Sequence, residues 1–423
     1  MKVEQFTGNA AILHILDELN EKGIKEKQFS DVVDDLGNQY VDLVQEGGGV
    51  LGIALAGYTY VLEQMDIRFL QLAGTSAGAI NTMLMAAAGK VHEEKACWML
   101  DKLANKNLSD FIDGDSDARD FVDVLLSGAG NLKIGMKGMQ VIDNFRDDFG
   151  LNPGKNFHQW IKNILSQNNI KTLADLEKLR EQQPDGGIKT RKGESRTPDR
   201  FKRVALITAD ITTETKVEFP RMAELYWENK EQVNPADFVR ASMSIPMFFH
   251  PYKVSNIPYG PERWKKWKEL AGYIGNIPNE VLFMDGGIMS NFPIDLFHNF
   301  SKVPDAPTFG VKLGLDRVEA NKNDKFFGLL GSIFDSARHV HDYDFIMRNP
   351  DYKHLLCFIE TGGHNWLNFN ISDDDKVDLF IRGARAAAGF LQGFDWDHYK
   401  NIRAQAAKLY QYDKATDDQV LSA

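Results

Sequence analysis

The sequence predicts an α/β fold in which helices cover the faces of a mainly parallel sheet. Apolar strands alternate with apolar helices over residues 40–88, and strand patterns return after residue 203. Strand, helix, strand and helix in this order favour parallel pairing with helices on the sheet faces. With 43% apolar and 26% charged residues, the 423-residue chain can bury a sizeable core. The chain is therefore expected to form one large domain with insertions, or two or three smaller ones.

The predicted elements follow from apolar spacing and from the residues that start or stop helices. Before residue 100 the pattern predicts a helix over 10–22, a strand over 40–45, a helix over 53–62, a strand over 67–73 and a helix ending near residue 88. Later strands are expected at 204–209, 281–284, 309–313 and 355–359. Ser372 followed by Asp375 resembles a capping box, so a helix should begin there and continue through Leu391.

These elements divide the chain into a main domain and two terminal segments. The predicted division is an N-terminal helical segment (1–39), a main domain (40–395) and a C-terminal helical tail (396–423). Two insertions are expected in the main domain, a helical and basic-loop region at 100–203 and a Trp/Lys-containing region at 252–280.

Charge and cysteine content limit the partners and the compartment. The net charge of −11 argues against broad affinity for nucleic acid or anionic lipid. Cys97 and Cys357 are far apart, so we expect neither a disulfide framework nor a cysteine zinc site, and a reducing compartment. The stretch 69–89 lacks charge, but polar residues and glycines interrupt it, which favours a buried strand, turn and helix over a membrane span. The start lacks a secretory signal pattern, so a cytoplasmic protein is expected.

One short motif matches the nucleophile elbow of hydrolases, G-x-S-x-G. It is the segment Gly74-Thr75-Ser76-Ala77-Gly78, which lies between a predicted strand and a predicted helix. In such an elbow the serine occupies a strained turn, and the glycines permit close chain approach. The helix N-terminus would also favour negative charge developing at Ser76. A plain tight turn with a capping serine is the alternative interpretation.

A second glycine-rich segment, Gly47-Gly48-Gly49-Val50-Leu51-Gly52, has three interpretations. It matches G-x-G-x-x-G, the pattern of a dinucleotide-binding site. Such a site also requires an acidic residue at the end of the second strand to bind the ribose. That strand ends at Ala73, and Asp66 lies at its start. The N–H groups of the loop could instead form an oxyanion hole, in which each donor is typically worth 10²–10³ in rate. The third interpretation is a purely structural turn.

Together with Asp285-Gly286-Gly287, which follows a predicted strand, these motifs make the chain resemble the patatin-like phospholipases. The resemblance covers about residues 40–395, with 100–200 poorly matched, and four segments carry it in the family's order. They are the segments 47–52, 74–78, 241–249 (Ala-Ser-Met-Ser-Ile-Pro-Met-Phe-Phe) and 285–293 (Asp-Gly-Gly-Ile-Met-Ser-Asn-Phe-Pro).

The resemblance implies a three-layer α/β/α sandwich and hydrolysis of acyl esters in phospholipids or related lipids. It implies Ser76 as nucleophile, Asp285 as its partner in a Ser-Asp dyad with Gly286 and Gly287 in support, and the loop 47–52 as oxyanion hole. Neither a metal nor a cofactor is expected. The family usually has Arg or Lys where this chain has Leu51, so the resemblance does not predict the lipid head group.

In a dyad the carboxylate must accept and return the protons that histidine transfers in a triad. An ordinary aspartate has a pKa near 3.9 and is a weak base at neutral pH, so such a carboxylate should be buried. A Ser-His-Asp esterase of the α/β-hydrolase type is the alternative, because six histidines follow the aspartate in the required order. They are His298, His339, His341, His354, His364 and His398.

The remaining expectations concern membranes and inactive relatives. Trp264 and Trp267 lie beside three lysines, a mixture found at lipid interfaces, and the basic loop 184–203 could assist. The alternative is a solvated helix with one tryptophan packed on the core. A non-catalytic lipid-binding or interaction module is an alternative to the enzyme, and a nicotinamide-dependent oxidoreductase is a remote third.

Overall fold

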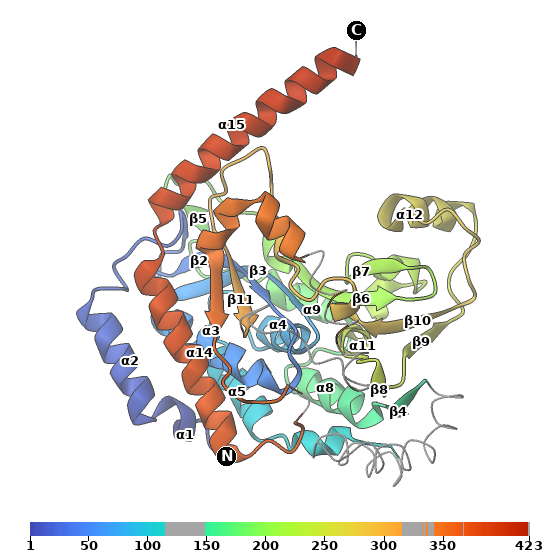
Figure 1. Ribbon diagram of the computed structural model, residues 1–423, viewed down its shortest axis with the longest axis horizontal. Coiled ribbons are helices and arrows are strands. Elements are labelled where there is room, and N and C mark those ends of the chain that lie inside the picture. The colour runs from blue at the N-terminus through green and yellow to red at the C-terminus, as the bar shows by residue number, and fades with distance from the viewer. Residues whose placement is uncertain (115–148, 315–331, 333–335, 337–341, 367, 422–423) are drawn as a thin grey trace.

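A mixed sheet forms the centre of the protein in the computed structural model, which describes residues 1–114, 149–314, 332, 336, 342–366 and 368–421 (Figure 1). The main path of the sheet runs in the order β12-β11-β2-β3-β6-β10-β9. These strands are β12 (Leu356–Ile359), β11 (Thr308–Leu313), β2 (Gln39–Gln45), β3 (Ile67–Thr75), β6 (Val204–Asp210), β10 (Glu280–Asp285) and β9 (Tyr252–Ser255).

Strand direction changes twice along this path, between β6 and β10 and between β10 and β9. The five strands from β12 to β6 are parallel, whereas β10 is antiparallel to β6 and β9 is antiparallel to β10. Three further strands pair antiparallel at the sides, namely β1 (Val32–Val33), β5 (Lys189–Thr190) and β7 (Thr215–Phe219). The expectation of a mainly parallel sheet is confirmed, with an antiparallel part beyond β6.

Helices lie on both sides of the sheet. The helices of the larger layer include α2 (Ala10–Glu21), α3 (Gly52–Gln64), α4 (Ala77–Ala87), α11 (Pro235–Ser242) and α14 (Asp373–Gly393). On the opposite face the short α10 (Pro198–Lys202) supplies Phe201 to a second apolar cluster with Tyr40 and Leu70. The α/β/α arrangement of the sequence prediction is therefore present, although the second face is covered by shorter elements.

The other described helices and strands surround this centre. They are α1 (Glu4–Thr7), α5 (Ala96–Ala104), α8 (Lys155–Gln167), α9 (Leu173–Arg180), α12 (Pro261–Ala271), α15 (Trp396–Leu421) and a separate pair of parallel strands, β4 (Gly150–Asn152) and β8 (Met247–Phe249). The last helix, α15, extends away from the rest of the molecule (Figure 1).

Several local predictions can be compared directly with these elements. The uncharged stretch 69–89 forms most of β3 and all of α4, and none of the described helices is long and apolar enough to cross a membrane. Ser372 caps α14 by accepting a hydrogen bond from the N–H of Asp375. The segment 184–203 was predicted to be a loop, but it contains β5 and α10, because β1 and β3 provide partners for it.

Helices α3 and α14 cross at two glycines. A Cβ on Gly57 would collide with the carbonyl oxygen of Phe380, and a Cβ on Gly383 would collide with that of Ala54. Because both obstacles are backbone atoms, neither can move aside cheaply. Side chains at these two positions would therefore push the helices apart, and α3 begins at the glycine loop.

We expect Gly383→Ala to lower the free energy of unfolding by about 1–3 kcal/mol, because overpacking forces the backbone to shift. The measurement is urea denaturation. Gly389→Ala is the matched control in the same helix, where an added Cβ meets nothing within 4 Å. The control should be neutral or stabilising by up to about 1 kcal/mol. Equal effects of the two substitutions would contradict the close contact.

Candidate active site

Ser76 lies on the turn between β3 and α4 in a strained backbone conformation. Its φ is 54° and its ψ is −118°, a combination that residues with a side chain rarely adopt. The flanking glycines permit this turn. A Cβ on Gly74 would collide with Gly78, and a Cβ on Gly78 would collide with the carbonyl oxygen of Gln45 on β2. The strand–turn–helix context expected for G-x-S-x-G is therefore present.

The hydroxyl of Ser76 donates a hydrogen bond to a carboxylate from a distant part of the chain. Its Oγ lies 2.7 Å from Oδ2 of Asp285, and the two side chains are only 5% and 3% exposed. The other carboxylate oxygen, Oδ1, accepts the N–H of Gly287 at 2.8 Å. The carboxylate is thus held by a backbone donor on one oxygen while the other faces the serine.

Sheet register brings these two residues together. Thr75 pairs with Ile207 on β6, and Asp285 pairs with the next residue, Thr208. Strand β10 runs antiparallel to β6. Asp285 approaches from the opposite direction and stops level with Ser76. Gly286 then passes so close to Ile207 that a Cβ would collide with its carbonyl oxygen.

The glycine loop 47–52 borders the same place, but most of its N–H groups have acceptors. Gly47 donates to the carbonyl oxygen of Asn291, and Val50 donates to that of Trp366. Leu51 and Gly52 donate within the turn, to the carbonyl oxygens of Gly48 and Gly49 respectively. The N–H groups of Gly48 and Gly49 are therefore the two of this loop that could bind an oxyanion.

A buried ion pair and a buried aspartate stabilise the segments next to the site. Nζ of Lys312 lies 2.8 Å from Oε1 of Glu46, the residue before the glycine loop, and both side chains are buried. Asp342 accepts hydrogen bonds from the hydroxyl of Ser290 and the N–H of Phe292, each at 2.7 Å. The first contact holds the residue before the glycine loop, and the second holds the segment that follows Asp285.

Residues without a predicted role also contact the site. Oγ of Ser242 accepts the N–H of Ser76 at 3.0 Å and donates to the carbonyl oxygen of Ile207 at 2.6 Å. Sδ of Met243 lies 3.2 Å from Oγ of Ser76. These residues belong to the segment 241–249 that carries the family resemblance, so that segment was the signal that could have identified them.

Trp366 covers the site. Together with Ile245 and Asn291 it lines a space of only about 10 Å³ over Ser76 and Asp285. A space of this size holds about one water molecule. A Cβ on Gly49 would collide with the carbonyl oxygen of Trp366, so the two segments are in close contact. No sequence motif pointed to Trp366.

Of the histidines of the alternative triad, the four that the structure describes do not line this space. Nδ1 of His298 lies 2.6 Å from the hydroxyl of Tyr352, and burial lowers its pKa to about 4. His364 contacts Asp378 at 2.9 Å, and the rings of His354 and His398 pack together. His339 and His341 lie outside the described residues. Across the described ranges, no group of three His, Cys, Asp or Glu side chains could hold a metal ion.

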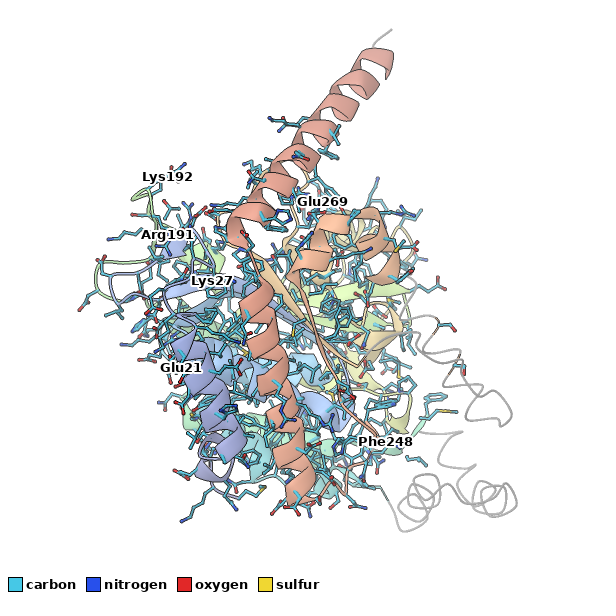
Figure 2. All side chains as sticks on the ribbon, turned by 60° about the vertical axis from the view of Figure 1, so that its left-hand side comes forward. Glu21, Lys27, Arg191, Lys192, Phe248 and Glu269 are labelled. Atoms are coloured by element: carbon cyan, nitrogen blue, oxygen red, sulfur yellow. The ribbon has the colours of Figure 1, made fainter. Side chains whose placement is uncertain are left out.

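Several of the residues predicted to contact a membrane are buried or paired with other residues of the protein. Trp267 is fully buried and packs against Tyr226, so its predicted lipid contact was wrong, whereas Trp264 is 41% exposed. Most of the basic side chains of 184–203 have partners within the protein, for example Lys189 with Asp35 at 2.6 Å. Lys192 is exposed at the tip of the segment (Figure 2).

A serine on such a turn, beside glycine N–H groups in an α/β sandwich, is an arrangement typical of serine hydrolases. A family model described as patatin-like phospholipase matches residues 43–298, and the chain belongs to this family. It is accordingly a hydrolase that acts on lipid esters.

The chain is also similar to individual proteins. It is 29% identical over 355 residues to the protein named "Uncharacterized protein YqhO" of Bacillus subtilis (strain 168), covering 84% of this chain and 98% of the relative. Among solved structures, VipD from Legionella pneumophila is 13% identical with a TM-score of 0.43, covering 86% of this chain and 70% of VipD. The matched chain in the complex of ExoU with SpcU from Pseudomonas aeruginosa is 15% identical with a TM-score of 0.33. The match covers 84% of this chain and 52% of that chain.

We expect Ser242→Ala to lower the free energy of unfolding by about 1–3 kcal/mol, because a buried N–H and a buried carbonyl lose their partner. Urea denaturation measures this loss. Ser255→Ala, at an exposed serine on β9, is the control and should change stability by less than about 0.5 kcal/mol. An unchanged stability of Ser242→Ala would show that this serine does not hold the turn.

Proposed function

We propose that the protein cleaves fatty-acyl esters of phospholipids or related lipids with Ser76 as nucleophile and Asp285 as general base and acid. The observation that carries this proposal is the 2.7 Å hydrogen bond between the two side chains, which are both buried. Family membership supports the substrate class.

The first half of the reaction forms an acyl-enzyme. Asp285 accepts the proton of the Ser76 hydroxyl while Oγ attacks the ester carbonyl carbon. The N–H groups of Gly48 and Gly49 stabilise the oxyanion of the tetrahedral intermediate, and each such donor is typically worth 10²–10³ in rate. The intermediate collapses as Asp285 gives its proton to the leaving alcohol. The acyl group remains on Ser76.

The second half releases the fatty acid. Asp285 accepts a proton from a water molecule, which attacks the acyl carbonyl, and the same glycine N–H groups stabilise the second oxyanion. Collapse returns the proton to Oγ of Ser76 and frees the acid. The carboxylate thus acts twice as base and twice as acid, without a histidine.

Leu51 differs from the basic residue that the family usually has at this position. Where the family usually has a basic residue, this side chain is only 6% exposed and belongs to the apolar core. It therefore offers no charge to a lipid phosphate. We expect any head-group recognition to come from other residues.

We expect Ser76→Ala to abolish ester hydrolysis and Asp285→Asn to reduce it by about 10²–10⁴-fold, because the serine would lose its base. Hydrolysis of phospholipid, lysophospholipid and neutral-lipid vesicles measures this. Asp397→Asn, at an exposed carboxylate on α15, is the control. Fluorophosphonate labelling of Ser76 separates the enzyme from a non-catalytic lipid-binding module. Full activity of a folded Asp285→Asn variant would remove Asp285 from the mechanism.

We expect Trp366→Ala to raise kcat/KM for bulky lipids, because the space over Ser76 now holds about one water molecule. The increase should be larger for phospholipids than for a short acetyl ester. Tyr259→Ala, which alters a side chain that is 86% exposed and does not line the space, serves as control. A fall in activity on both substrates would mean that Trp366 supports the glycine loop more than it blocks entry.

A further inference from the structure

A second, apolar pocket begins beside Ser76. It has a volume of about 40 Å³ and is lined by Gly49 and Ala77, among others. Gly49 also lines the space over the Ser76 hydroxyl, and Ala77 is the next residue after Ser76. The apolar pocket and the space over the Ser76 hydroxyl therefore share Gly49 as a wall.

Side chains from four elements form the walls. They are Ile53 on α3, Ile80 on α4, Leu103 on α5 and Phe111 on the 3₁₀ turn η2 (Leu108–Phe111). The polar side chain in the lining, Asn81, donates its amide to the carbonyl oxygen of Gly52 at 2.8 Å. An apolar pocket of this kind suits a hydrocarbon chain, since each buried methylene favours binding by about fourfold.

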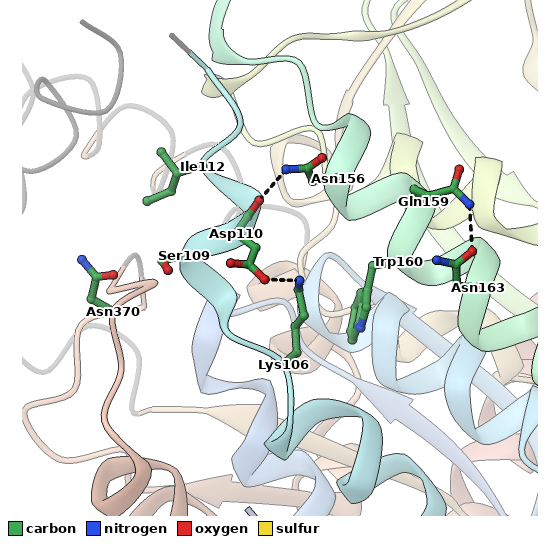
Figure 3. Close-up of a pocket in the computed structure, with 9 residues that line it drawn as sticks. All are labelled: Lys106, Ser109, Asp110, Ile112, Asn156, Gln159, Trp160, Asn163 and Asn370. Atoms are coloured by element: carbon green, nitrogen blue, oxygen red, sulfur yellow. Dashed lines mark hydrogen bonds and ion pairs between the residues drawn. The ribbon is translucent and has the colours of Figure 1, made fainter. Parts of the chain in front are cut away.

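Trp160 on α8 forms the far wall. Its ring packs against Phe111 with centroids 5.2 Å apart and against Phe157 at 6.0 Å. Trp160 also lines a larger depression of about 680 Å³, which Lys106, Asp110 and several amide side chains line as well (Figure 3). The indole thus separates the apolar pocket from a polar, open one.

We propose that the apolar pocket binds the acyl chain of the ester and that Trp160 limits the length of chain that fits. This inference rests on the proposed function of Ser76. Leu103, Phe111 and Trp160 all come from residues 100–200, which the sequence resemblance matches poorly. These three walls therefore lie outside the four segments that carry the resemblance.

The pocket's size makes the inference specific. Its 40 Å³ is about three times the space that one water molecule needs, so only a short length of hydrocarbon fits while Trp160 stays in place. A longer chain must displace the indole toward the polar depression. Removing the indole joins the two spaces, and filling the pocket at Ile80 shortens the path.

The test measures kcat/KM for p-nitrophenyl esters with acyl chains of 2 to 16 carbons. We expect Trp160→Ala to move the optimum to longer chains by at least two carbons. We expect Ile80→Phe to lower the ratio of kcat/KM for the best wild-type ester to that for the acetate at least tenfold. Tyr259→Ala, at a residue 86% exposed and outside the pocket, is the control and should leave the profile unchanged.

The outcomes separate this inference from the proposed function. If the wild-type protein and Ser76→Ala hydrolyse the esters equally, the proposed function fails. If the wild-type protein is active but Trp160→Ala and Ile80→Phe change all esters by the same factor, the acyl pocket is overturned. Thermal denaturation shows whether Ile80→Phe folds, and if it does not, the profile of Trp160→Ala alone decides.

Discussion

Strand β6 lies between β3 and β10, and its register with both decides where Ser76 and Asp285 meet. The residue before Ser76 pairs with Ile207, and Asp285 pairs with Thr208. A slip of one residue in either ladder would turn side chains to the opposite face of the sheet. The 2.7 Å hydrogen bond therefore depends on backbone pairing across three strands, from segments 209 residues apart.

Buried polar contacts fix the loops that follow these strands. The Glu46–Lys312 pair fixes the end of β2 against β11, directly before the glycine loop. Asp342 fixes the segment after Asp285 through a side chain and a backbone N–H. Charges buried in this way need partners, because an unpaired one would be costly. Each contact therefore holds the site in one arrangement.

Local pattern was enough to predict the serine turn and the parallel strands. A strand, a turn with two glycines and a helix are all encoded within residues 67–88, and nothing distant is needed to recognise them. The direction of β10 was not predictable, because period-two alternation is the same for parallel and antiparallel strands. The same holds for Trp264 and Trp267, whose sequence surroundings are alike. Only the packing of α12 against Tyr226 buries one of them.

The contact between α3 and α14 has a consequence for the order in which the site is completed. Ser76, Asp285 and the glycine loop are all synthesised well before α14, yet α3 packs closely on Gly383 of that helix. Trp366 also arrives late and accepts a hydrogen bond from the glycine loop. After Asp285 the ribosome adds 81 residues to reach Trp366 and 98 residues to reach Gly383. The candidate site is therefore braced only after Trp366 and Gly383 have been synthesised.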